Sequence, residues 1–254
     1  MRALILGLAV AVGLHTSAMA EEVVLGLSQD EVAITATFDG SDILIFGAVK
    51  REAPALNDPP LDVVIAITGP NKPVTVRKKD RRFGIWVNTE AVEIDQAPSF
   101  YAVATTRPLD VALSNTEDLR HRVSLDQAVR TVGAAEVTDD VDAFLDALQR
   151  IRMDEGTYQV REGAVALDEQ TLFRTSLTLP ADLTEGDYST RIFLTRGGAV
   201  VDSYETTIDV RKVGLERWLY NLAHTQPLVY GLMSLAIAIA AGWLASAAFG
   251  LLRR

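Results

Sequence analysis

Cysteine is absent from this chain of 254 residues. Without thiols the protein can form no disulfide, no thiolate metal site and no cysteine nucleophile, so its fold depends on packing alone. Histidine is scarce, because residues 21–254 contain only His121 and His224. The sequence also lacks the H-E-x-x-H and G-x-S-x-G motifs and any glycine-rich phosphate-binding loop. These absences favour a protein that is not an enzyme and that holds no cofactor and no metal ion.

Basic residues are fewer than acidic ones in the part of the chain between its two apolar terminal segments. Residues 21–226 contain 34 acidic side chains against 21 basic ones, which gives this region a net charge of −13. An acidic surface of this kind keeps a domain soluble and argues against nucleic acid as a partner. The region is long enough for one large or two modest hydrophobic cores.

The amino end of the chain has the features of an export signal. Residues 3–14 form an apolar run that is too short to cross a bilayer. Ala18 and Ala20 follow in the small-x-small pattern that signal peptidase cleaves. We therefore predict a signal peptide over residues 1–20 and a mature chain that begins at Glu21.

The carboxyl end has the features of a membrane span. Residues 228–252 contain no charge, and at about 1.5 Å per residue they can cross a hydrocarbon core of roughly 30 Å. Arg253 and Arg254 follow the predicted span (227–252), whereas its other flank has no lysine or arginine. The positive-inside rule then places the carboxyl terminus in the cytoplasm. The prediction is a single-pass protein of the inner membrane with a periplasmic domain.

Residues 21–108 have the pattern of an immunoglobulin-like β-sandwich. Short runs rich in β-branched and aromatic residues are separated by turn residues throughout this segment. The run 32–38, for example, is apolar at every second position, and a hairpin signal follows at Asp39-Gly40. Seven or so strands, with turns at intervals of about 8–12 residues, are typical of such a sandwich.

Residues 109–213 change period and predict helices followed by a smaller sheet. Ser124 and Gln127 form a capping box before a short helix that Gly133 would end. A longer helix is expected over about 139–153, where apolar residues recur on one face. The remainder of the segment alternates as strands do, so we expect either a smaller α+β domain or a second sandwich-like domain.

A tyrosine corner is one sign of sandwich character in this second segment. Gly186-Asp187-Tyr188 leads into an alternating strand, as the corner tyrosine of sandwich domains does. In that motif the tyrosine hydroxyl bonds back to a nearby backbone group. A Gly-x-Tyr sequence also arises by chance, so both readings stay open at this point.

One stretch reverses the local sign of charge. Five basic residues occur within six positions between two predicted strands; this basic cluster consists of Arg77, Lys78, Lys79, Arg81 and Arg82. It could contact anionic lipid headgroups or an acidic partner, because clustered basic residues near a charged surface contribute about 1 kcal/mol each. The alternative is a solvated hairpin tip without a ligand.

The segment before the span predicts a helix over 214–226. Its apolar residues share one helical face, and its aromatic side chains suit the headgroup region. The helix either lies in the membrane interface or forms a short stalk that packs on the domain. The residues expected at the interface are Trp218, Tyr220, Tyr230, Arg253 and Arg254.

Small residues recur every four positions within the span. This small-residue stripe consists of Ala238, Gly242, Ser246 and Gly250. Small side chains on one face let a second helix approach closely, so the stripe predicts contact with an integral membrane protein or with a second copy of the chain. Because alanine is plentiful in the span, chance is the alternative.

Several short phrases, taken together, match a known family. They are FG at 46–47, GP at 69–70, VRKK at 76–79, GIWVN at 84–88, PSFYA at 98–102, LFR at 172–174, GDY at 186–188, YG at 230–231 and AGWLAS at 241–246. The set resembles a family of transmembrane proteins of unknown function from alpha-class proteobacteria, with a signal, a β-rich ectodomain and a single anchor. The resemblance implies this topology but no activity and no functional residues. Family members are often encoded beside permeases that resemble sulfite exporters, which implies a permease as partner.

Two functions follow from these observations. The first is a non-enzymatic accessory or interaction subunit of a membrane complex that also contacts membrane lipid. The second is a module that binds a small anion, such as an oxidised sulfur species, and passes it to a transporter. Its pocket would be lined by Arg107, Arg174 or the basic cluster. An enzyme would need a cleft that joins carboxylates to His121.

Overall fold

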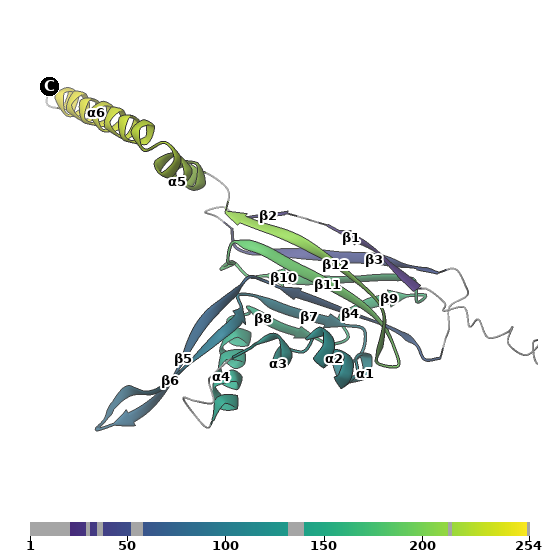
Figure 1. Ribbon diagram of the computed structural model, residues 1–254. Coiled ribbons are helices and arrows are strands. Elements are labelled where there is room, and N and C mark those ends of the chain that lie inside the picture. The colour runs from purple at the N-terminus through teal and green to yellow at the C-terminus, as the bar shows by residue number, and fades with distance from the viewer. Residues whose placement is uncertain are drawn as a thin grey trace, which may run out of the picture.

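The computed structural model describes residues 21–28, 31–34, 38–51, 58–131, 140–212 and 215–252. The predicted signal peptide, and Arg253 and Arg254, lie outside these residues. β-strands in several sheets make up about half of the described chain, and a long apolar helix follows them at the carboxyl end (Figure 1). The mainly β fold class and the apolar helix at the carboxyl end are thus confirmed.

Two sheets form the body of the protein. The smaller has the strand order β1 (Glu21–Leu27), β3 (Ser41–Arg51), β10 (Leu172–Leu179) and β9 (Ala166–Asp168), and all its pairs are antiparallel. The larger has the order β2 (Glu31–Ile34), β12 (Ala199–Lys212), β11 (Gly186–Arg196), β4 (Leu61–Thr68), β7 (Tyr101–Thr105) and β8 (Tyr158–Arg161). Its outer pairs, β2 with β12 and β7 with β8, are parallel.

The six-stranded sheet separates two hydrophobic cores. On β4, Val63, Ile65 and Ile67 face the four-stranded sheet and join the first core. Val64 and Ala66 alternate with them and face the second core, on the other side. Because β4 is buried on both faces, its sequence is a continuous apolar run rather than an alternating one.

Helices cover the outer face of the six-stranded sheet (Figure 1). They are α1 (Leu109–Ala112), α2 (Asn115–His121), α3 (Leu125–Ala128) and α4 (Val141–Asp154). Phe144 and Leu148 of α4 insert into the second core, as the helical spacing predicted. The protein therefore has three layers, in the order sheet, sheet and helices.

The helices differ from the prediction in two places. The helix after Ser124 is shorter than expected, because Val129 is already extended and Arg130 pairs with Gln96 in a β-bridge. The Ser124 side chain makes no capping hydrogen bond. Helix α2 was not predicted, although Ser114 caps it by accepting a hydrogen bond from the Glu117 amide at 3.4 Å.

Strands from the two predicted segments, 21–108 and 109–213, lie side by side in both sheets. β10 pairs with β3, and β11 pairs with β4. Both cores also contain residues from both segments, so the segments share their packing. The facing sheets form a sandwich, while its immunoglobulin-like character stays a prediction.

The tyrosine corner is present. Tyr188 lies near the start of β11, its ring is buried in the first core, and its hydroxyl donates a hydrogen bond to the Thr184 carbonyl at 2.8 Å. The bond ties the strand to the loop before it, so this reading of Gly186-Asp187-Tyr188 is confirmed.

The carboxyl-terminal helices are α5 (Leu215–Thr225) and α6 (Pro227–Leu252), separated by Gln226. These bounds agree with the helix and the span that the sequence predicted. Residues Pro227–Ser246 have a mean hydropathy of 2.0 and none is buried against the rest of the protein. An apolar helix of this length is stable only in an apolar medium, which fits a membrane span.

Candidate interaction surfaces

A long hairpin projects from the body of the protein. It consists of β5 (Asn71–Arg82) and β6 (Ile85–Pro98), which form a separate two-stranded sheet (Figure 1). Val76, Val92 and Ile94 bury its base in the second core. Beyond this base the hairpin is largely exposed, so its outer half is longer than packing requires.

The sequence had suggested that the basic cluster lies in a loop between two strands. In the structure it lies on β5 itself. The turn is formed by Phe83 and Gly84, whose φ angles are 50° and 87°. Two-residue hairpin turns of this kind need φ > 0 at both positions and favour Asn-Gly. Lysine and aspartate are depleted in strands, and this is why the segment resembled a loop.

Three large apolar side chains occupy the tip of the hairpin. Phe83 is fully exposed, and Ile85 and Trp86 are 65% and 69% exposed. A bulky residue with φ > 0 is a conformational outlier, so phenylalanine at position 83 makes the turn less stable than a residue that tolerates this φ. The exposed tip therefore has the composition of a contact surface rather than of a solvated turn.

The alternation of β5 divides the basic cluster between two faces. Arg77, Lys79 and Arg81 lie on one face, and Arg81 is directly opposite Trp86. The register shift between Lys78 and Lys79 does not disturb this alternation, because the extra residue is on β6. Within the part of the chain that the structure describes, these three cations have no acidic partner within salt-bridge distance.

The opposite face of β5 is close to neutral. Lys78 lies 3.8 Å from Glu90, and Arg82 lies 3.2 Å from Asp80. Exposed pairs of this kind contribute little to stability, but they cancel charge. The hairpin thus has one balanced face and one cationic face that includes Trp86.

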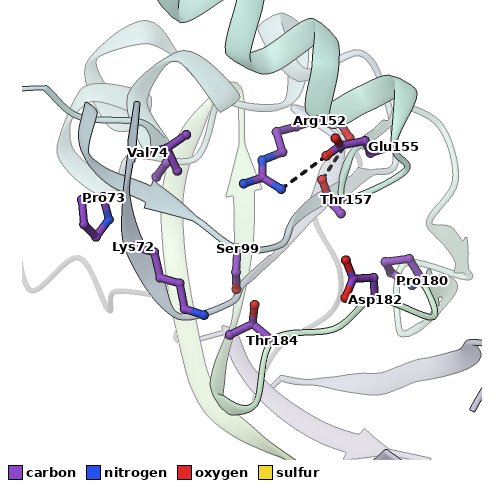
Figure 2. Close-up of a pocket in the computed structure, with 11 residues that line it drawn as sticks. Lys72, Pro73, Val74, Ser99, Arg152, Glu155, Thr157, Pro180, Asp182 and Thr184 are labelled. Atoms are coloured by element: carbon purple, nitrogen blue, oxygen red, sulfur yellow. Dashed lines mark hydrogen bonds and ion pairs between the residues drawn. The ribbon is translucent and has the colours of Figure 1, made fainter. Parts of the chain in front are cut away.

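A polar cavity of about 610 Å³ lies beside the base of the hairpin (Figure 2). Its charged lining residues are Lys72, Arg152, Glu155 and Asp182, and Arg152 is hydrogen bonded to Glu155 at 3.3 Å. Two cations against two carboxylates leave no net charge. The cavity therefore does not favour a ligand of one charge sign.

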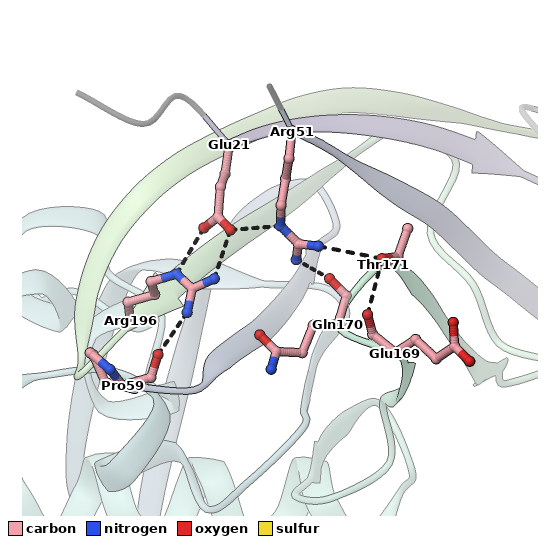
Figure 3. A network of polar contacts seen from close by, with 7 residues as sticks. All are labelled: Glu21, Arg51, Pro59, Glu169, Gln170, Thr171 and Arg196. Carbon is pink, nitrogen blue, oxygen red and sulfur yellow. Dashed lines mark hydrogen bonds and ion pairs between the residues drawn. The ribbon is translucent and has the colours of Figure 1, made fainter. Parts of the chain in front are cut away.

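A polar network secures the start of β1 (Figure 3). The Glu21 carboxylate accepts hydrogen bonds from Arg51 Nε at 2.7 Å and from Arg196 Nε and Nη2 at 2.9 and 2.7 Å. Arg51 also binds the Gln170 carbonyl, and Arg196 binds the Pro59 carbonyl at 2.6 Å. The side chains of the ion triad are only 9–11% exposed, so this network is structural.

The three alternatives that the sequence offered for the lining of an anion pocket lie in different parts of the structure. Arg107 is paired with the buried Asp62, and Arg174 is an exposed residue of β10 that lies 3.7 Å from Asp168. The basic cluster lies on the hairpin, apart from both. An anion pocket lined by one of these alternatives therefore stays a prediction.

The single candidate base, His121, is engaged in the structure. Its Nε2 lies 3.3 Å from Glu117 Oε2, and its ring packs against Phe193 with the centroids 5.1 Å apart. Across the described residues, no three or more histidine, aspartate or glutamate side chains are grouped so that they could hold a metal ion.

The predicted interface and stripe residues are exposed where the structure describes them. Trp218, Tyr220 and Tyr230 are 52%, 63% and 38% exposed. In the stripe, Ala238, Gly242 and Ser246 are exposed, and Gly250 continues the same spacing in α6. Apart from neighbouring residues and the backbone of α6 itself, no atom of the described chain would lie within 4 Å of a Cβ at Gly242, so a second helix has access there.

The protein family described as "Putative transmembrane protein (Alph_Pro_TM)" matches residues 22–250. The chain belongs to this family. The match includes the hairpin, both sheets and most of α6 in this family member, and it confirms the family that the sequence phrases indicated. No curated protein matches the chain.

Proposed function

We propose that the protein is a non-enzymatic, membrane-anchored accessory subunit whose exported domain binds a partner in a membrane complex. Family membership and the exposed apolar helix α6 support the anchor. The basic pair Arg253 and Arg254 supports a periplasmic domain and an inner-membrane location. The accessory role is supported above all by the β5–β6 hairpin.

The exposed tip of the hairpin is the observation that carries the proposal. Phe83, Ile85 and Trp86 remain in solvent, where burying each would be worth roughly 1.5–3 kcal/mol. Exposed aromatic and arginine side chains are the residue types that dominate binding energy at protein interfaces. A hairpin that only closed the fold would need neither the length nor this tip.

The partner that fits the hairpin has an apolar pocket with an acidic rim. The pocket would receive Phe83 and Trp86, and the rim would face Arg77, Lys79 and Arg81. Charge complementarity of this kind accelerates association and selects the partner. An acidic loop of an integral membrane protein meets this description and lies within reach of an anchored domain.

The span offers a second contact in the same complex. The small-residue stripe would let a partner helix approach α6 closely. With two contacts on one chain, the second binding event becomes intramolecular, so each contact can be weak.

The surface of the bilayer is the second candidate for the hairpin. Tryptophan beside lysine and arginine is also typical of segments that lie in the headgroup region of anionic membranes. The anchor holds the domain near such a surface in any case.

A photo-crosslinking amino acid in place of Trp86 tests the proposal in intact cells. After mild-detergent purification on a tag placed behind Arg254, we expect one dominant crosslink to an integral membrane protein. A crosslink to lipid alone would assign the hairpin to the membrane. Recovery of uncrosslinked monomer throughout would overturn the interaction role.

Matched variants separate the two contacts. Phe83→Asn should reduce capture of the partner, whereas Leu172→Ala, an exposed apolar position on β10, should not. Gly242→Leu should reduce capture through α6, whereas Ala240→Leu places a leucine on another face of the helix and should not. Equal capture by all four variants would contradict both contacts.

A further inference from the structure

We infer that a second cavity, distinct from the hairpin tip, binds a small oxyanion or a short molecule that ends in one. The cavity has a volume of about 370 Å³ and lies where α2 and α3 meet the six-stranded sheet. Three arginines line it, Arg122, Arg130 and Arg191, against a single carboxylate, Glu205. This local excess of positive charge occurs on a region whose net charge is −13.

Arg191 is held in place without a carboxylate. It is directly opposite Glu205 across β11 and β12, where an ion pair would normally form. Glu205 instead accepts a hydrogen bond from Ser189 Oγ at 2.7 Å. Arg191 donates to the carbonyls of His121 and Arg122 at 2.5 and 3.1 Å.

Aromatic packing further restricts Arg191. Its guanidinium carbon lies 5.7 Å from the centre of the Phe193 ring, within the range of a cation–π contact. The hydrogen bonds to backbone carbonyls and the contact with the Phe193 ring fix the position of the Arg191 guanidinium. Neither contact neutralises its positive charge. A cation ordered before the ligand arrives costs little conformational entropy on binding.

Arg122 and Arg130 bring two more uncancelled charges to the rim. In the described ranges, neither is within salt-bridge distance of an acidic side chain. Arg122 follows α2 with φ at 53°, and Arg130 is fixed by backbone hydrogen bonds to Gln96 at 2.9 and 3.1 Å. Both backbones are therefore constrained, so the two side chains start from defined positions.

Neutral hydrogen-bonding groups complete the lining. Asn71 and Gln127 contribute amides, and the Thr68 hydroxyl is buried without a hydrogen-bond partner among the described residues. Guanidinium forks and amide donors match the oxygen atoms of phosphate, sulfate and carboxylate groups. The volume exceeds that of a bare ion, so it also admits a small organic acid.

The test uses the full chain in a neutral detergent, at constant ionic strength, titrated with inorganic phosphate, sulfate and succinate by calorimetry. We expect saturable binding of at least one probe. Arg122→Gln with Arg130→Gln should raise its dissociation constant by roughly tenfold or more, while the unfolding midpoint without ligand is unchanged. Arg191→Lys keeps the charge but loses the fork, and should also weaken binding.

The control removes equal charge from the hairpin. Arg77→Gln with Arg81→Gln should leave the dissociation constant unchanged, although it should impair capture of the membrane partner. Failure of all three probes to bind would overturn the inference without affecting the proposed hairpin contact. Equal weakening by both double variants would also overturn it, because the effect would then be one of net charge.

Discussion

Glu21 joins parts of the chain that are far apart in sequence. Its carboxylate bridges Arg51 of β3 and Arg196 of β11, which belong to different sheets (Figure 3). Because all three side chains are about 10% exposed, the charges are poorly solvated and depend on one another. The residue that the cleavage prediction places first in the mature chain is thus also a structural clamp.

Replacing Glu21 by Gln should lower the free energy of unfolding by about 2–4 kcal/mol, because two nearly buried arginines lose their counter-ion. Chemical denaturation of the purified chain measures the loss. Glu22→Gln is the matched control, since Glu22 pairs with Lys50 at an exposed position and should cost less than about 1 kcal/mol. Equal losses in the two variants would contradict the clamp.

The same carboxylate makes stability depend on pH. Hydrogen bonds, above all from Arg196 and then from Arg51, lower the pKa of Glu21 below its ordinary value of 4.5. The unfolded chain therefore takes up a proton before the folded one does. The contribution of the Glu21 carboxylate to the free energy of unfolding is present above pH 4.5. It is lost as the pH falls through the lowered pKa of the folded state.

Unfolding curves of the parent and Glu21→Gln should accordingly converge on acidification. The difference in free energy of unfolding is expected to be largest near neutral pH and to shrink steadily below about pH 4.5. A difference that stays constant down to the acid transition would show that Glu21 acts only through packing.

At the scale of elements, the hairpin turn has two unusual properties. Phe83 adopts a backbone conformation that is unfavourable for a bulky residue, and the side chains of the tip are exposed rather than packed against the protein. Gly84 suits its φ of 87°, whereas Phe83 at 50° does not. A sequence shaped only by turn stability would place asparagine there. The partner contact proposed for the tip would account for the aromatic side chain.

Two substitutions of Phe83 should separate stability from binding. Phe83→Asn should stabilise the turn by about 0.5–1 kcal/mol, whereas Phe83→Val should weaken it, because a β-branched residue resists φ > 0. Hydrogen exchange of the amides near the turn, at Arg82 and Ile85, measures the change. Both variants should lose partner capture, and full capture by Phe83→Asn would rule out a role for the ring.

At the scale of the whole molecule, the body keeps its apolar residues away from solvent, whereas the span exposes them. The body buries apolar residues in two cores, while residues Pro227–Ser246 bury nothing in the protein. Each is stable only in its own medium, and α5 lies between them. The direction in which the chain crosses the bilayer then decides where the hairpin and the cationic cavity can act.

The absence of cysteine allows a clean test of that direction. Leu172→Cys on β10 should react with a membrane-impermeant maleimide in spheroplasts, because Leu172 is 57% exposed. A cysteine added after Arg254 should react only after lysis. The parent chain gives the blank, and the reverse labelling pattern would overturn the proposed periplasmic domain.

Local patterns in the sequence allowed much of the secondary structure to be predicted, but some signals were missed. The helical spacing of α4 correctly predicted that Phe144 and Leu148 are buried. Ser114 and Glu117 form a capping pattern at the start of α2, a helix that was not predicted. At Ser124, the same kind of pattern gave a helix of one turn, because Arg130 pairs with Gln96 of β6 instead.

The sites depended on information that is not local. The clustering of five cations was visible in the sequence, but their division into a balanced and an unbalanced face follows from the register of β5 with β6. The arginines of the second cavity were not singled out at all, because Arg122 and Arg191 lie 69 positions apart. No spacing rule connects such residues before the chain is folded.

The sequence by itself determined the anchor, the β-rich class and the family, because apolar runs and alternation are properties of neighbouring residues. Only the tertiary structure decided which strands pair, because strands that are far apart in the sequence can form hydrogen bonds with each other. Leu177, for example, pairs with Ile43 across more than half the chain. That long-range pairing merges the two predicted segments around shared cores and brings the arginines of the second cavity together.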